Sequence, residues 1–226
     1  MQPSFVTAVF QFVLLLFSIT VHECAHAWTA SRLGDQTARM MGRVSLNPVD
    51  HIDPIGTLLL PALIIFGPFF GFGMFGGVLI GWAKPVPIVS RNFRNYKRDD
   101  MLVSVAGPIA NLLLGVIFFL ALAAILIYQK QMPLLEAPST SLRTFATLCN
   151  LGLQLNLTLC IFNLIPIPPL DGSHILRQFL PYNAVQVYDR ISGIASYLLI
   201  ILAARMVLGI LLHPVYFVAY AILDRI

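Results

Sequence analysis

Long apolar stretches alternate with short polar segments along this chain. Four of them are long enough to cross a bilayer as helices, which takes about 20 residues. They cover about residues 5–33, 101–128, 143–166 and 193–212. A helix satisfies its backbone hydrogen bonds within its own segment, as a medium without water requires. The pattern therefore predicts an all-α polytopic membrane protein with about four full transmembrane helices.

A fifth apolar stretch, about residues 55–82, is interrupted by glycine and proline. It has about 28 residues, whereas two crossings need roughly 40. We therefore predict a re-entrant or half-inserted Gly-rich hairpin that leaves and returns on one side, with its turn in the run from Gly67 to Gly77. Irregular backbone at membrane depth is tolerated only against protein or a wet cavity. The hairpin should therefore border the functional site.

The polar segments are too short to fold as separate domains, so we expect one membrane domain over residues 1–226. Its first helix is followed by a segment that includes the hairpin, about residues 34–98, and by the other three spans. The tail, residues 213–226, is apolar, and the pattern does not decide whether it lies along the membrane surface or crosses it.

Composition agrees with the membrane prediction. Hydrophobic residues make up 58% of the chain and charged residues 11%, and the mean hydropathy is +0.83. The net charge of +4 would suit a nucleic-acid partner only if the basic residues formed one surface. Instead they flank the apolar stretches, in three groups that the positive-inside rule assigns to the cytoplasm: Arg32, Arg39, Arg43; Lys84, Arg91, Arg94, Lys97, Arg98; Arg177, Arg190. We therefore expect a multi-pass protein of the inner cell membrane and no nucleic acid.

Candidate metal chemistry lies near the end of the first predicted helix, in the sequence HECAH that starts at His22. The spacing puts His22 and His26 on one helix face, one turn apart, where both can bind one metal ion. Glu23 can then take a proton from a metal-activated water. Ionisable residues are costly inside a membrane helix and are usually functional. We interpret HECAH as a zinc site and not as a chance match.

A catalytic zinc usually has three protein ligands and a position left for water. Asp171 is the strongest third candidate, because it follows the third span at the same depth as HECAH. Two alternatives stay open from the residues alone: Asp171 only caps the next helix, or His174 is the ligand. His51 is a further candidate for supporting the site from beside it.

Three motifs in order resemble the site-2 protease family of intramembrane zinc metalloproteases, peptidase family M50. They are HECAH, AGPIAN at residues 106–111 and NLIPIPPLDG at residues 163–172. The resemblance covers nearly the whole chain. The segments GRVSLNPVDHIDPIGT and GWAKPVPI are similar to the short bacterial and archaeal branch, without PDZ or CBS domains. These Pro-containing segments also predict short β-strands near the active site.

The resemblance implies one Zn²⁺ per chain, bound by His22, His26 and Asp171, with Glu23 as general base and acid. It also implies that Asn163 lies beside the metal, where its amide could donate to the oxyanion. Asn111 falls on the family's GPxxN motif, where it lines the substrate path or forms an interhelical hydrogen bond.

We therefore expect an intramembrane zinc metalloprotease whose active site lies near the cytoplasmic face. Its partners would be the lipid bilayer and transmembrane or membrane-anchored protein substrates. The sequence does not decide the substrate or the oligomeric state. The alternative is a membrane metal-ion or proton transporter that uses the same His, Asp and Glu cluster. That alternative is less favoured, because these residues gather at one depth and are not spread across the membrane.

Overall fold

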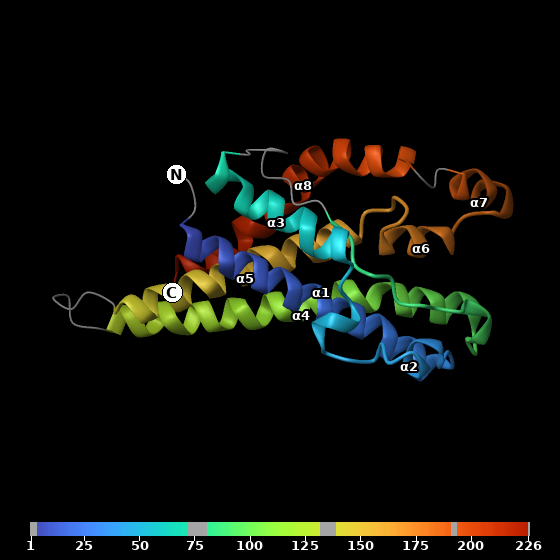
Figure 1. The fold of residues 1–226 in the computed structure, drawn as a ribbon, viewed down its shortest axis with the longest axis horizontal. Coiled ribbons are helices and arrows are strands. Elements are labelled where there is room, and N and C mark those ends of the chain that lie inside the picture. The colour runs from blue at the N-terminus through green and yellow to red at the C-terminus, as the bar shows by residue number, and fades with distance from the viewer. Residues whose placement is uncertain (1–3, 72–80, 132–138, 191–193, 226) are drawn as a thin grey trace.

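The computed structural model describes residues 4–71, 81–131, 139–190 and 194–225 (Figure 1). Within these ranges the regular structure is helical. The α-helices are α1 (Phe5–Leu33), α2 (Thr37–Met40), α3 (Leu60–Phe66), α4 (Tyr96–Gln131), α5 (Thr140–Asn163), α6 (Asp171–Arg177), α7 (Tyr182–Asp189) and α8 (Ile194–Leu223). A π-helical turn (Pro54–Leu59) leads into α3, and short 3₁₀ turns cover Pro48–Asp50, Gly67–Phe70 and Ser90–Asn92.

Three helices, α1, α4 and α5, form the centre of the molecule and pack side by side (Figure 1). Among the described residues, these are the helices long and apolar enough to cross a membrane. Apolar side chains drive helix association weakly in lipid, so close contact depends on small residues. Gly152 of α5 supplies such a contact, because a Cβ there would lie 2.7 Å from the ring of Phe118 on α4.

The end of α1 is fixed to the segment before α4. Gly34 closes the helix with a φ of 119°, a conformation that glycine adopts without a steric cost. The next residue, Asp35, is fully buried. Its carboxylate accepts hydrogen bonds from Thr37, from the backbone amide of Val89 and from the side chain of Asn92. This one carboxylate therefore joins the polar segment after α1 to the approach to α4.

The first arm of the predicted hairpin lies along α1. It comprises the π-helical turn, α3 and the Gly67–Phe70 turn. Phe66 at the end of α3 packs against Phe5 and Phe12, with ring centroids 5.7 Å apart in each pair. The arm therefore extends as far as the first turn of α1.

The chain then returns to the place where the arm began. The backbone amide of Trp82 donates to the carbonyl of Gly56 at 3.2 Å, and the Thr57 hydroxyl donates to the carbonyl of Trp82 at 2.8 Å. Two points 26 positions apart in the sequence are thus held together, which agrees with a hairpin that leaves and returns on one side. Most of the predicted turn, at residues 72–77, lies outside the described residues.

The predicted short β-strands are not confirmed. No strand occurs among the described residues, and the segment 81–88 has no regular secondary structure. Pro85 and Pro87 lack the N–H that a strand ladder requires. The segment is attached at its start instead, where the amide of Lys84 donates to the carbonyl of His51 at 3.0 Å.

The predicted count of four spans is not confirmed either, since three candidate spans are found in the described part of the chain. The last predicted span, about 193–212, belongs to a longer helix, α8, that continues through Pro214 to Leu223. Residues 213–223 are therefore a continuation of this helix. The third span ends at Asn163 and not near 166, because Pro166 disfavours a helical conformation at Ile165.

Candidate metal centre

His22 and His26 are buried on α1, and each ring is held through its Nδ1 atom. Nδ1 of His26 lies 2.8 Å from the carbonyl oxygen of Val103 on α4. Because a carbonyl only accepts, this Nδ1 carries the hydrogen and Nε2 of His26 has a free lone pair. Nδ1 of His22 lies 2.6 Å from the side-chain oxygen of Asn111, also on α4. The Nε2 atoms of both histidines are therefore available as ligands.

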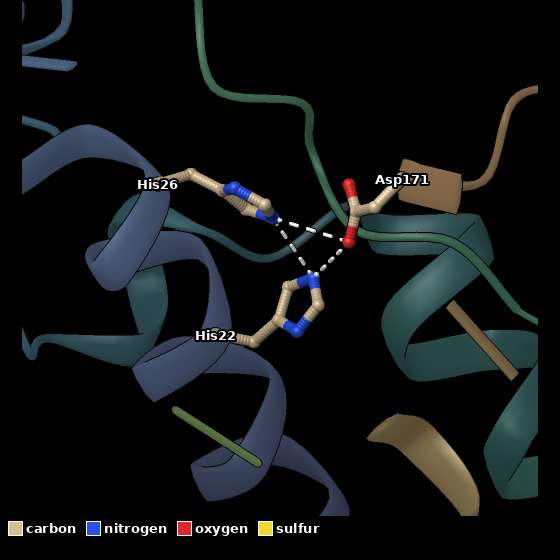
Figure 2. Close-up of side chains that lie close together, drawn as sticks. All are labelled: His22, His26 and Asp171. Atoms are coloured by element: carbon tan, nitrogen blue, oxygen red, sulfur yellow. Dashed lines mark hydrogen bonds and ion pairs between the residues drawn. The ribbon is translucent and has the colours of Figure 1, made fainter. Parts of the chain in front are cut away.

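Asp171, the first residue of α6, brings a carboxylate to the same point. Its Oδ2 atom lies 3.2 Å from Nε2 of His22 and 3.4 Å from Nε2 of His26, and the two Nε2 atoms are 3.0 Å apart (Figure 2). Oδ2 is buried and receives no hydrogen bond among the described residues. Three potential ligand atoms thus face one another at a point that could hold a metal ion.

The spacing fits zinc. Ligands at about 2.0–2.1 Å from a tetrahedral zinc are separated from one another by about 3.3 Å. The observed separations of 3.0, 3.2 and 3.4 Å are close to this value. In the described part of the chain, these three residues form the group of metal-ligand side chains that could hold an ion. Burial alone would raise the pKa of Asp171, but the two imidazoles lower it below the ordinary carboxyl value, so the carboxylate is ionised.

Space for the centre is provided by Gly107 on α4. A Cβ at this position would lie 2.4 Å from Nε2 of His26 and 2.6 Å from Nε2 of His22. Contacts under 3.0 Å are not tolerated, so any side chain here would displace the ligand atoms.

The position of Asp171 depends on two contacts of α6. Gly172 packs on the end of α5, where a Cβ would lie 2.2 Å from the carbonyl oxygen of Leu164. At the other end, the side chain of Gln178 donates to the carboxylate of Asp100 on α4 at 2.7 Å. The short helix is thus held at both ends, and its first residue faces α1.

The two predicted catalytic residues have different surroundings. Glu23 is half-buried on α1, and its carboxylate interacts electrostatically with His26. Asn163 is the last residue of α5, and its amide donates to the carbonyl of Leu159 at 2.9 Å.

The three residues predicted to support the centre have different positions. Asn111 contacts His22 directly, as described above. His51 is buried beside the carbonyl of Ser45, at 2.9 Å from its Nε2 atom, and does not join the ligand group. His174 is exposed on α6 and is also outside this group.

Sequence reasoning missed Asn156 of α5, which is fully buried and hydrogen-bonded to Asn111 at 3.0 Å. The signal was present in the sequence, because a polar amide in the middle of an apolar span is costly unless it has a partner.

Comparison with known proteins decides the family, since the model for peptidase family M50 matches residues 10–206. The chain belongs to this family. YwhC of Bacillus subtilis, named as a candidate zinc metalloprotease, is 40% identical to this chain over 169 residues. The matched region covers 75% of this chain and 68% of YwhC. Rip2 of Mycolicibacterium smegmatis, named in the same way, is 32% identical over 165 residues. The zinc metalloprotease MJ0392 of Methanocaldococcus jannaschii is 25% identical over 169 residues.

The chain spans 55% of Rip2 and 34% of MJ0392. No solved structure matches it. Family and relatives together make the M50 peptidase a membrane metalloprotease with zinc as its cofactor.

Proposed function

We propose that this M50 peptidase hydrolyses peptide bonds of membrane-embedded or membrane-anchored proteins at one zinc ion held by His22, His26 and Asp171. The observation that carries the proposal is the meeting of three ligand atoms inside a bundle of apolar helices. At 1.5 Å per helical residue, His22 is about 26 Å along α1 from Phe5 and about 17 Å from Leu33. The chemistry would therefore take place within the membrane boundary.

Zinc in this centre supplies Lewis-acid chemistry that makes water nucleophilic near neutral pH. Glu23 takes the proton of the attacking water and passes it to the leaving amide nitrogen. The amide of Asn163 donates to the negative charge that develops on the substrate carbonyl oxygen. Because this amide now donates to Leu159, substrate binding must turn it away from its own helix.

The test is cleavage of a transmembrane peptide by the purified, zinc-loaded chain. Glu23→Gln should bind zinc as the parent does and lose at least about 100-fold in the cleavage rate, because a positioned general base contributes at least this much. Glu136→Gln, the same chemical change at a residue between α4 and α5 in the sequence, should cleave like the parent. The protease mechanism is wrong if Glu23→Gln and the parent cleave equally well.

The transporter alternative is tested with the same protein in sealed vesicles. A transporter would move zinc or protons across the vesicle membrane and leave the peptide intact. The proposed function predicts cleavage of the peptide and no zinc or proton flux above that of empty vesicles.

A further inference from the structure

Three buried side chains form a continuous hydrogen-bonded chain from α5 through α4 to α1. The side-chain nitrogen of Asn156 donates to the carbonyl of Gly152 at 2.9 Å. The side-chain nitrogen of Asn111 donates to the side-chain oxygen of Asn156 at 3.0 Å. Nδ1 of His22 lies 2.6 Å from the side-chain oxygen of Asn111. Both asparagines are fully buried, so water does not compete for these groups.

The carbonyl of Gly152 determines which group donates and which accepts in every hydrogen bond of this network. The carbonyl of Gly152 can only accept, so the NH₂ group of Asn156 must face it. The side-chain oxygen of Asn156 then faces Asn111. Because this oxygen only accepts, Asn111 must turn its own NH₂ group toward it. The oxygen of Asn111 is thereby directed at His22. Nδ1 of His22 must carry the hydrogen, and its Nε2 atom is left with the lone pair that a metal requires.

We propose that Asn156 is a positioning residue for the metal centre: through Asn111, it sets which nitrogen of His22 carries the hydrogen and holds the ring with Nε2 toward zinc. The inference rests on the proposed zinc site of His22, His26 and Asp171. It adds a residue on α5, a helix that carries none of the three ligands.

The alternative partner for Asn111 is weaker. Its side-chain nitrogen also lies 3.4 Å from the carbonyl of Ser18 on α1, near the upper limit for a hydrogen bond. Without Asn156, the Asn111 amide can turn over and present its NH₂ group to His22. Nδ1 of His22 would then have to accept, and the hydrogen would move to Nε2, where it competes with zinc.

The spacing of the helices makes the chain of bonds geometrically feasible. Gly152 lets α5 approach the Phe118 ring of α4, and Gly115 on α4 lies opposite Leu157 and Asn156 on α5. Asparagine is short, so two asparagines on neighbouring helices meet only where the backbones are close. The small residues therefore bring the two helices close enough for the two amides to form a hydrogen bond.

The test measures zinc affinity of the full chain by competition with a chelator. Asn156→Leu keeps the volume but removes the acceptor for Asn111, and we expect the dissociation constant for zinc to rise about 10-fold, the lower end for residues behind a metal ligand. Asn156→Asp should restore the parent affinity. A buried acid there is protonated, so its carbonyl accepts from Asn111 and its O–H donates to Gly152.

Thr158→Val is the matched control on the same helix. It removes a partly buried hydroxyl that bonds to Tyr216 of α8 at 2.8 Å, away from Asn111. This variant should bind zinc as the parent does. The visible absorption of the Co²⁺-substituted protein gives a second readout. Its bands should shift in Asn156→Leu and stay unchanged in Thr158→Val.

The route through Asn111 is tested in the Asn111→Ala background, where Asn156→Leu should cause no further loss of zinc affinity. An equal affinity of Asn156→Leu and Thr158→Val, a full additional loss in the Asn111→Ala background, or no restoration by Asn156→Asp would each overturn the proposal. If Asn156→Leu does not fold, Asn156→Ala carries the same expectations. If His22→Ala leaves the zinc affinity of the protein unchanged, the proposed metal site itself is refuted, and not only the role of Asn156.

Discussion

A glycine on α4, Gly107, leaves the space that the two imidazoles of the metal centre need. Gly107 of α4 lies beside the two imidazoles, and a Cβ there would lie 2.4–2.6 Å from their atoms. The histidines cannot yield easily, because their Nδ1 atoms are bonded to Val103 and Asn111. A methyl group would therefore separate the ligand atoms.

Gly107→Ala should weaken zinc binding by at least about 100-fold, because it moves the ligands themselves and not only the groups behind them. Chelator competition measures the effect. Gly209→Ala, on α8, is the control. Its new Cβ would meet no atom within 4 Å. Equal zinc affinity in the two variants would contradict this account of Gly107.

At this scale, the sequence predicted which three side chains meet better than it predicted their surroundings. The spacing of His22 and His26 places both on one helix face, so their pairing followed from the helix alone. Asp171 lies about 150 positions away, and its role was implied by the family resemblance. The contact between Asn111 and Asn156 joins two helices. No local pattern shows which two polar residues on different helices meet.

At the scale of the elements, the buried carboxylate of Asp35 explains how the segment after α1 is joined to the approach to α4. Burial alone would raise the pKa of Asp35, but the hydrogen bonds from Thr37, Val89 and Asn92 outweigh it and lower the pKa below the ordinary carboxyl value. The carboxylate form is therefore the one that the folded protein favours. Its contribution to stability is complete above the unfolded pKa, about 3.9, and is lost as the pH falls through the folded pKa.

Asp35→Asn should lower the free energy of unfolding at pH 7 by about 2 kcal/mol, because an NH₂ group would face N–H donors. The difference from the parent should shrink below about pH 4, where the parent carboxylate is protonated as well. Thermal unfolding at pH 7, 4 and 3 measures both effects. Asp224→Asn, on an exposed residue, should match the parent throughout. A gap that stays constant with pH would refute the role of the charge.

The bounds of a helix were predicted best where the apolar pattern is long. The first predicted helix and α1 have the same bounds, 5–33. The ends of α5 and α8 were misplaced, because proline had different effects at the two sites: Pro166 lies beyond the end of α5, while α8 continues through Pro214. Strands at 81–88 were not confirmed, because a Pro-containing segment has the same sequence signature whether or not a partner strand exists.

For the whole molecule, charge indicates how the bundle is oriented. Exposed basic residues gather at the end of the bundle nearer the metal centre: Arg32, Arg39, Lys84, Arg91, Arg94, Lys97 and Arg98. We propose that this end faces the cytoplasm, as the positive-inside rule requires. The end of α4 and the start of α5 then lie on the opposite side.

Single added cysteines test this orientation in intact cells with a membrane-impermeant maleimide. Ser139→Cys, at the start of α5, should be labelled from outside. Met41→Cys, in the exposed segment after α2, should be labelled only after the membrane is opened. The parent, whose Cys149 and Cys160 are buried, gives the background. Labelling of Met41→Cys in intact cells would reverse the proposed orientation.

The distance in sequence between the ligands has a consequence for synthesis. His22 and His26 leave the ribosome early, whereas Asp171 follows only after α5 is complete. A nascent chain with its first three long helices in the membrane still has two ligands and no third. With the proposed ligands, the zinc site is therefore completed only after most of the polypeptide has been made.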